Sequence, residues 1–288
     1  MSGLLTESKP LIEAIAKRQA YLVLGAGVSI GATNNAKCAS WKGLLLNGID
    51  RCAARKLLSD DAAELQRSQL ELDDTDLWIN VAQAVERKLK RAKDFAPWLQ
   101  STVGSLHAEN AATITALSSL GIPIVTTNYD NILEEITGLE PVTWMDVAEC
   151  VEVFRGDRAA IIHIHGHFEK PESVILGVSS YEDILRDERA QQFLKALNFL
   201  QSAIYVGYGK GLKDPNFGKL LDWRSQVLSD HKYSDFRLVR EPEIASIETE
   251  HKKGERIELI SFGSKHAELE PFLVNLAEET EALSLIHI

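Results

Sequence analysis

The chain has 288 residues, of which 45% are hydrophobic and 25% charged, as is ordinary for a globular protein that buries a full core without metals or disulfides. Its formal net charge of −11 provides no overall basic field, so nucleic acid is not expected as the main ligand. Three cysteines without a C-x-x-C pair argue against a zinc ribbon or a disulfide framework and indicate free thiols in a reducing cytosol.

No segment of the chain has the pattern of a membrane anchor or an export signal. No run approaches the ~18 apolar residues of a membrane span, and the N-terminus lacks a basic segment followed by an apolar one. We therefore expect a soluble cytoplasmic protein that does not associate with membranes. The final residues, LSLIHI, match one reading frame of a widely used sequencing adapter. We hypothesise that residues 283–288 are not native and that the native chain continues beyond residue 288.

The first part of the chain predicts one strand followed by helices. Residues 8–16 carry a proline and an apolar stripe typical of a short helix, and the apolar run at 21–24 predicts the first strand. That strand ends in the glycine turn GAGVS and a polar loop, after which a helix begins near Trp41. From about residue 57 to 120 the apolar residues keep helical spacing, so we predict a helical insertion there.

Strands and helices alternate over the rest of the chain. Strands are predicted at 122–126, 161–167, 203–206, 235–239 and 256–260, with one or two short strands within 141–154. Helices are predicted at 132–138, from Ser180 as the cap to about 201, after Asp214, and at 271–283. Apolar strands separated by helices are what a parallel sheet covered on both faces requires. We therefore predict an α/β fold that forms a single domain over residues 1–288.

Four apolar runs of the predicted sheet end directly in glycine or polar residues. They are YLVLGAGVS from Tyr21, IPIVTTNYD from Ile122, IIHIHGH from Ile161 and AIYVGYGKG from Ala203. In parallel sheets of this kind, ligands bind outside the carboxyl ends of the strands, at the point where the strand order reverses. We therefore expect the four polar tails to meet in one crevice.

The first of these tails is rich in glycine. Gly25 and Gly27 allow the backbone to turn tightly and to approach a diphosphate, which backbone N–H groups can bind. The dinucleotide-binding pattern G-x-G-x-x-G is incomplete, because Ile30 occupies the third glycine position and the nearest acid, Asp50, falls on a predicted helix. The pattern G-x-x-x-x-G-K-[ST] is absent. Dehydrogenases and P-loop nucleotidases are therefore disfavoured, and a plain glycine turn remains an alternative.

The second tail places an amide and a carboxylate at the crevice. Asn128 can both donate and accept hydrogen bonds, so it can orient a ribose hydroxyl or a water molecule. Asn128 and Asp130 could instead cap the helix that follows them. The sequence leaves both interpretations open.

The third tail carries alternating histidines. If the strand continues through them, His163, His165 and His167 share one face. His165 precedes a glycine at the strand end and suits a general base, whereas His163 lies within the apolar run and is expected to be a hydrogen-bonded core residue. A metal bound by the three histidines would need a further carboxylate or water, which the sequence does not indicate. We favour base chemistry over a metal site and over a purely structural set of histidines.

Four motifs occur in the order and spacing of the Sir2-like family: GAGVS, TTNYD, HIHGH with PESVILGVSSYEDI behind it, and VGYGKGLKDPNF. Over residues 21–217 the chain resembles in particular the bacterial NAD-hydrolysing anti-phage effectors of that family. The resemblance implies a Rossmann-like sheet that holds NAD as substrate without a metal, with Asn128 and His165 in the catalytic positions and Asp130 near the nicotinamide amide. The NAD-binding residues that it implies are Gly25, Ala26, Gly27, Val28, Ser29, Thr127, Asp130, Gly207, Tyr208 and Asp214.

The chain departs from the protein deacylases of this family. It has no four-cysteine zinc module, and no strand motif for an acyl-peptide cleft follows the histidines. We therefore predict an NAD+ glycohydrolase that acts in anti-phage defence by NAD depletion, a form of abortive infection. A deacylase, an ADP-ribosyltransferase and a non-catalytic NAD or ADP-ribose sensor are the alternatives. Because uncontrolled NAD hydrolysis would harm the host, we expect a homo-oligomer or a regulatory partner such as an ATPase or a nucleotide-sensing subunit.

Overall fold

A computed structural model describes residues 8–72, 74–209, 233–251 and 256–286 of the chain. Within these residues, seven strands form one sheet in which every pairing is parallel. Most of the strands coincide with the apolar runs of the sequence, as expected for a sheet that is buried on both faces. The strands are β1 (Ala20–Leu24), β2 (Ile124–Thr126), β3 (Glu140–Thr143), β4 (Ala160–His163), β5 (Ser202–Val206), β6 (Asp235–Val239) and β7 (Ile257–Ser261).

The strand order across the sheet is β3-β4-β2-β1-β5-β6-β7. From β1 the chain moves outwards through β2 to β4 on one side, and then from β5 outwards to β7 on the other. Without the edge strand β3, this is the order 3-2-1-4-5-6 of the Rossmann fold. The order reverses between β1 and β5, and the predicted α/β, Rossmann-like fold is confirmed.

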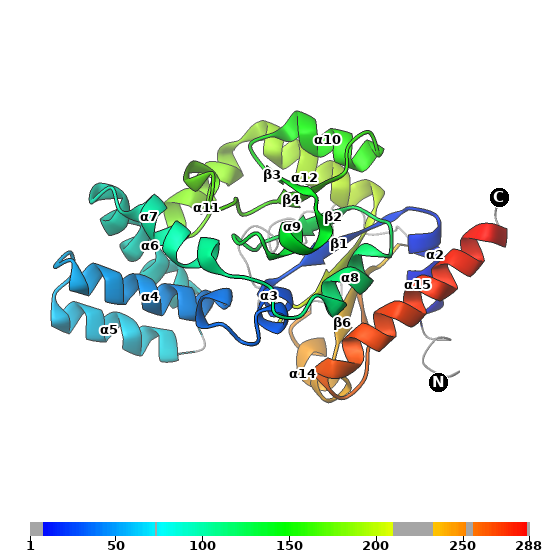
Figure 1. The fold of residues 1–288 in the computed structure, drawn as a ribbon, viewed down its shortest axis with the longest axis horizontal. Coiled ribbons are helices and arrows are strands. Elements are labelled where there is room, and N and C mark those ends of the chain that lie inside the picture. The colour runs from blue at the N-terminus through cyan, green and yellow to red at the C-terminus, as the bar shows by residue number, and fades with distance from the viewer. Residues whose placement is uncertain (1–7, 73, 210–232, 252–255, 287–288) are drawn as a thin grey trace.

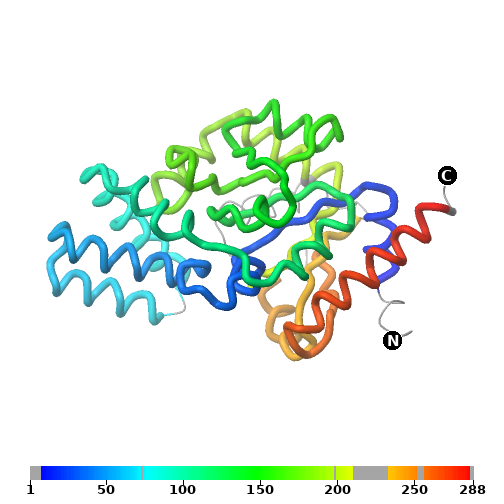
Figure 2. The backbone as a smooth tube through the Cα atoms, viewed as in Figure 1, coloured from blue at the N-terminus to red at the C-terminus, as the bar shows by residue number. Residues whose placement is uncertain are grey.

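Helices cover both faces of the sheet (Figure 1), and alternate residues of β1 show which helices pack on which face. Leu22 and Leu24 belong to a core formed with α2 (Lys9–Ala16), α8 (Ala112–Ser118), α9 (Ile132–Thr137) and α15 (Leu269–Ile286). Tyr21 and Val23 belong to a second core, formed with α10 (Val147–Arg155), α11 (Val178–Arg186) and α12 (Glu188–Leu200). Figure 2 shows α2 beside α15, so segments from opposite ends of the sequence pack together.

A layer of helices between β1 and β2 packs beside the sheet, at the left of Figure 1. Its members are α4 (Trp41–Ala54), α5 (Asp60–Glu71), α6 (Thr75–Arg91) and α7 (Phe95–Ser101). The side chains of Ser40, Ser59 and Asp74 cap the first three by accepting hydrogen bonds from backbone N–H groups. The insertion predicted at about 57–120 overlaps this layer, but α4 packs with the layer and α8 packs on α9 and α15 instead.

Several local predictions were wrong. The expected glycine turn after β1 is the short helix α3 (Ala26–Ala32). Of the one or two short strands predicted within 141–154, one is present as β3, and α10 follows it. β4 ends at His163 because Gly166, with φ +86°, turns the chain and donates its N–H to the carbonyl of His163. Ser180 lies inside the first turn of α11, which begins two residues earlier, at Val178.

The remaining short elements of the described chain are α14 (Ile244–Glu248) and the 3-10 helices η1 (Lys37–Ala39), η2 (Val103–Ser105), η3 (Pro171–Ser173), η5 (Glu241–Glu243) and η6 (His266–Glu268). The helix predicted after Asp214 lies outside the described residues. Cys38, Cys52 and Cys150 are free thiols, as predicted. Among the helices that the structure describes, none combines the length and the apolar composition needed to cross a membrane.

Candidate active site

A cavity of about 440 Å³ lies at the carboxyl edge of the sheet, beside the point where the strand order reverses. Its size falls within the range of ligand and cofactor pockets. Part of its lining directly follows β1, β2, β4 and β5, and the rest comes from the helical layer and the segments around it. The predicted site residues that line it are Ala26, Thr127, Asn128, Asp130, His165, Gly207 and Tyr208.

The ends of β1 and β5 touch through glycines. Gly207 has φ +74°, and its carbonyl oxygen accepts a hydrogen bond of 2.9 Å from the N–H of Gly27. A Cβ atom on Gly27 would lie 2.7 Å from that carbonyl oxygen, and one on Gly207 would lie 2.8 Å from the backbone nitrogen of Val28. Both positions require glycine because the two backbones are in contact.

Backbone N–H groups of the GAGVS segment are partly used inside the protein. The N–H of Gly27 donates to Gly207 O, and that of Val28 donates to Gly25 O at 3.0 Å. The first bond joins the ends of β1 and β5 and the second closes the start of α3, so both N–H groups of this predicted diphosphate loop are engaged inside the protein. Ala26 is the member of the segment that lines the cavity. A contact between this segment and a diphosphate stays a prediction.

Asn128 is 6% exposed and its side chain is fixed by two hydrogen bonds. Its Nδ2 donates to Gly25 O at 3.2 Å and to Ser29 Oγ at 2.8 Å. Because a carbonyl oxygen only accepts, the amide nitrogen must face Gly25. The amide oxygen Oδ1 is therefore the group that can accept a hydrogen bond from a bound molecule.

Ser29 connects Asn128 to Asp130. The hydroxyl of Ser29 donates to Asp130 Oδ1 at 3.1 Å, and the same oxygen accepts from the N–H of Ile132, the first residue of α9, at 3.1 Å. Burial raises the pKa of Asp130 to about 6, although the hydrogen bonds from Ile132 and Ser29 oppose that rise. The capping and site interpretations both apply, since Asp130 binds the start of α9 and lines the cavity.

His165 lines the cavity from the end of β4. The turn at Gly166 brings it there, and a Cβ atom on that glycine would overlap the carbonyl oxygen of Ser173. The carbonyl of His165 accepts from the N–H of Ile175 at 2.8 Å, and its ring meets that of Tyr181 edge to face at 5.7 Å. His165 and Asn128 thus line one cavity from the ends of adjacent strands.

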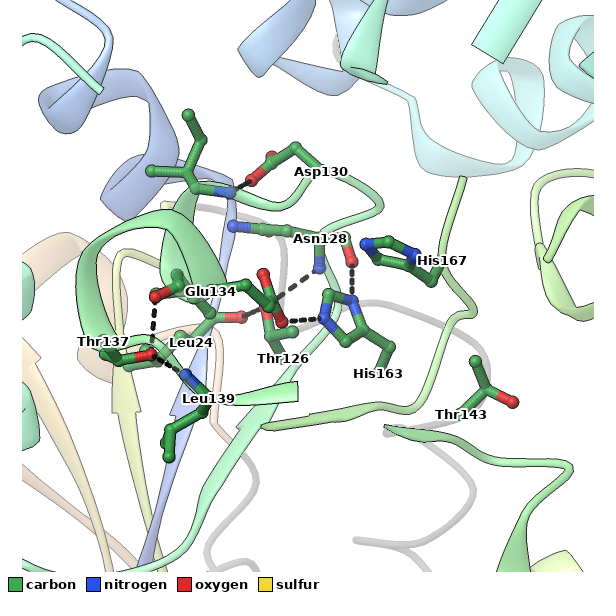
Figure 3. A network of polar contacts seen from close by, with 12 residues as sticks. Leu24, Thr126, Asn128, Asp130, Glu134, Thr137, Leu139, Thr143, His163 and His167 are labelled. Carbon is green, nitrogen blue, oxygen red and sulfur yellow. Dashed lines mark hydrogen bonds and ion pairs between the residues drawn. The ribbon is translucent and has the colours of Figure 1, made fainter. Parts of the chain in front are cut away.

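His163 and His167 form a separate buried cluster with Glu134 of α9 (Figure 3). Nδ1 of His163 donates to the carbonyl oxygen of Asn128 at 2.8 Å, and its Nε2 lies 2.7 Å from Glu134 Oε1. The rings of the two histidines meet edge to face with centroids 4.8 Å apart. The prediction that all three histidines share one face was wrong, because the chain leaves the strand after His163 and only His165 reaches the cavity.

Burial and Glu134 set the charges in this cluster. Burial lowers the pKa of His163, but the hydrogen bond to Glu134 and the charge of that carboxylate outweigh burial and hold the pKa above its usual value. Burial, together with the charge of His163, lowers the pKa of His167 to about 3. In this arrangement one proton lies between Nε2 of His163 and Glu134 Oε1, and the low pKa of His167 leaves its ring neutral at neutral pH.

The predicted binding residues not yet described differ in their positions: some line the cavity, some lie behind its lining, and one lies outside the described residues. Gly25, Gly27, Val28 and Ser29 contact lining residues without being part of the described lining. The hydroxyl groups of Thr127 and Tyr208 hydrogen bond to each other at 3.0 Å across the cavity floor. Asp214 lies outside the described residues, so its predicted role has no structural description.

The helical layer contributes lining residues that sequence reasoning missed. Trp41 of α4 and Trp78 of α6, with ring centroids 5.8 Å apart, line the cavity together with Asp74 and Thr75. The helical spacing of the two tryptophans with the apolar residues around them predicts that both lie in the core. One available signal is that each tryptophan lies near the start of its helix, where a large side chain can extend past the helix end. Trp41 directly follows the cap Ser40, and Trp78 is the fourth residue of α6. Tyr181 was missed as well.

Residues 123–260 match the family model of the SIR2-like domain. The match runs from β2 to β7 and includes Asn128, Asp130 and His165. It supports the resemblance to the Sir2-like family. A SIR2-like domain is consistent with an enzyme that uses NAD. The fold and this match together define a Rossmann-like α/β protein with a SIR2-like segment.

Proposed function

We propose that the protein is an NAD+ glycohydrolase, which converts NAD+ and water to ADP-ribose and nicotinamide. The observation that carries this proposal is that Asn128 and His165 line one cavity from the ends of adjacent strands, next to the point where the strand order reverses. Dinucleotides bind at that point in sheets of this class. The SIR2-like match supports NAD as the substrate.

The chemistry requires positioning more than a strong acid. The bond between C1′ of the ribose and the pyridinium nitrogen breaks, and its electron pair stays on nicotinamide, which leaves as a neutral molecule. The sugar then resembles an oxocarbenium ion in the transition state, and water adds to C1′ and loses a proton. Fixed dipoles and a proton acceptor next to the ribose favour this path.

The described side chains fit these tasks. His165 takes the proton from the attacking water or from a ribose hydroxyl. Oδ1 of Asn128 accepts a hydrogen bond from the same water or hydroxyl, because its Nδ2 already donates to Gly25 and Ser29. Asp130 lies in the same hydrogen-bonded network, where it can face the nicotinamide amide.

Purified protein incubated with NAD+, with and without an acetylated peptide, tests the reaction. We expect nicotinamide and ADP-ribose in equal amounts without peptide. Release that depends on the peptide would indicate a deacylase, and transfer of ADP-ribose to protein would indicate a transferase. Binding of NAD+ without products would indicate a sensor. Each of the last three outcomes contradicts the proposal.

The biological part of the proposal is anti-phage defence by NAD depletion in the cytoplasm. It is supported by the resemblance of the four motifs to bacterial effectors. An enzyme that empties the NAD pool must be restrained until infection. We therefore include in the proposal a homo-oligomer or a regulatory partner, such as an ATPase or a nucleotide-sensing subunit, that governs access to the cavity.

Bacteria that carry the wild-type gene or His165→Ala, challenged with phage, test this part. We expect cellular NAD to fall after infection only with the wild type, and phage yield to fall with it. Equal protection by both proteins, or protection while NAD remains constant, would contradict defence by NAD depletion.

A further inference from the structure

Glu134, His163 and His167 bring three potential metal ligands together (Figure 3). One ligand atom from each residue lies within 4.8 Å of the other two. The residues come from α9, from the end of β4 and from the turn after it, so the fold and not the local sequence assembles them. The side chains are buried, with exposures of 10%, 0% and 2% respectively.

A proton on His163 satisfies only part of this cluster. Nδ1 of His163 donates to the carbonyl oxygen of Asn128, and a proton lies between its Nε2 and Glu134 Oε1, 2.7 Å apart. Within the described residues, Glu134 Oε2 and His167 Nε2 remain buried without a hydrogen-bond partner. Buried polar atoms are nearly always satisfied, so two such atoms in one cluster indicate a missing ligand.

We propose that Glu134, His163 and His167 bind one divalent transition-metal ion, with Zn²⁺ as the expected occupant. Two imidazoles and one carboxylate form a ligand set suited to Zn²⁺, whereas Mg²⁺ and Ca²⁺ prefer oxygen ligands alone. Three protein ligands leave one tetrahedral position for a water molecule. The metal site considered from the sequence consisted of the three histidines and had no carboxylate. In the structure, Glu134 takes the place of His165 in the set of ligands.

The hydrogen bonds of His163 match those of a metal-bound histidine, whereas those of His167 have to change when a metal binds. A ligating histidine usually donates its other ring N–H to a carbonyl or carboxylate, as Nδ1 of His163 does to Asn128 O. Nδ1 of His167 accepts a 3.4 Å hydrogen bond from the N–H of Glu169. Coordination through Nε2 moves the ring proton of His167 to Nδ1, which replaces this hydrogen bond by one to the Glu169 carboxylate, now 3.9 Å away.

Metal binding requires a small rearrangement of the cluster and the loss of one proton. Ligand atoms at about 2.0–2.1 Å from Zn²⁺ lie roughly 3.4 Å apart in a tetrahedron, so pairs separated by up to 4.8 Å must approach, whereas Nε2 of His163 and Oε1 of Glu134, 2.7 Å apart, must separate. His163 releases its Nε2 proton to solvent, because imidazole binds a metal as the neutral form. A divalent ion bound by one carboxylate and two neutral imidazoles gives the site a net charge of about +1.

The metal has a structural role next to the cavity. In the described part of the chain, none of the three ligands lines the cavity. His163 holds the carbonyl of Asn128, and His167 follows His165 by two residues, so one ion fixes both segments that carry the proposed catalytic groups. Loading is expected to accompany folding, since the ligands are buried.

Metal analysis of tag-free protein tests this site. Protein produced with added zinc and then dialysed is analysed by mass spectrometry for manganese, iron, cobalt, nickel, copper and zinc. Metal-depleted protein is refolded with increasing Co²⁺ while its visible absorption is followed. We expect about one equivalent of transition metal per chain, an absorption that saturates at about one equivalent of Co²⁺, and a higher melting temperature in the loaded protein.

Glu134→Gln and His167→Asn each remove one ligand, and we expect metal content to fall about tenfold or more in both. Glu135→Gln is the matched control, since it changes the neighbouring carboxylate of α9, which is 36% exposed and outside the cluster. Circular dichroism checks that each variant folds. Wild-type protein that retains no transition metal, or metal content that both ligand variants keep, would overturn the site. The metal content is read independently of NAD cleavage.

Discussion

Asn128 enters the cavity with both amide N–H groups already engaged, one by a carbonyl and one by the hydroxyl of Ser29. Ser29 passes the network on to Asp130, which also binds the first residue of α9. A fixed amide loses little conformational freedom when it meets a substrate, and such preorganisation is what the proposed reaction needs. We therefore expect substitution of Asn128, Ser29 or Asp130 to change both the free energy of unfolding and the rate of NAD cleavage.

Asp130→Asn tests the environment of this network. The pKa of Asp130 rises from 3.8 to about 6, so between these pH values the folded protein holds a proton that the unfolded chain has lost. Wild-type stability therefore falls as pH rises through this window, by about 3 kcal/mol from this group. Asparagine does not titrate. We expect the stability of Asp130→Asn relative to wild type to increase by up to that amount between about pH 4 and pH 7.

Urea unfolding of both proteins across this pH range measures the difference. Comparing the two proteins cancels the titration of the other groups. A difference in unfolding free energy that stays constant with pH would show that Asp130 is not buried as described.

At the scale of elements, the ends of β1 and β5 are held together by backbone contacts and not by side chains. Gly27 and Gly207 touch, and Tyr208 reaches over to Thr127 at the end of β2. Buried Arg237 of β6 donates to the carbonyl oxygens of Tyr208 and Gly209 and so supports the end of β5 from the next strand. The shape of the cavity floor therefore depends on fixed distances between the ends of β1, β2 and β5.

Gly207→Ala tests this spacing. Alanine at φ +74° is strained, and its Cβ would lie 2.8 Å from Val28 N, so we expect destabilisation of about 2 kcal/mol or more and a loss of NAD cleavage. Gly31→Ala is the control, because no atom lies within 4 Å of the added Cβ and the position is in α3. It should be neutral or stabilising by about 0.5–1 kcal/mol. Equal unfolding curves for both variants would contradict the contact.

The strands that border the cavity could be predicted from the sequence, because each of them is an apolar run that ends in glycine or polar residues. The end of β4 could not, since the period-two pattern of HIHGH continues past the glycine that turns the chain. The partner of His163 could not be found either, because Glu134 lies 29 residues away on a helix whose placement depends on the whole fold. The sequence already separated His165 from His163, but the placement of His167 beside His163 and Glu134 required the structure.

At the scale of the whole molecule, the helical layer forms a wall of the cavity. Sequence periodicity gives the helices and their apolar faces, but it does not show how the layer is placed against the sheet. Trp41 and Trp78 line the cavity as a result of that placement. We infer that the tryptophans of the helical layer increase the affinity for the substrate, whereas the residues at the strand ends, Asn128 and His165, carry out the reaction.

Trp78→Ala tests this division. Loss of an aromatic face against a base or nicotinamide ring should raise KM for NAD+ about tenfold, because such contacts stabilise binding by about 1–3 kcal/mol. The kcat should change little, because the reacting groups lie elsewhere. Leu65→Ala, at a position of α5 that is 60% exposed, is the control. A large fall in kcat with unchanged KM would contradict an affinity role for the wall.

In the proposed reaction, Asn128 and His165 act together on the ribose–nicotinamide bond of NAD. The most direct measurement is nicotinamide release by purified His165→Ala and Asn128→Ala, with His107→Ala, whose side chain is 79% exposed, as the control. We expect a loss of at least about a hundredfold in both site variants, retained NAD binding by His165→Ala in a thermal-shift assay, and full activity in the control. Nicotinamide release at the wild-type rate by a normally folded His165→Ala protein would contradict the proposed catalytic role of His165.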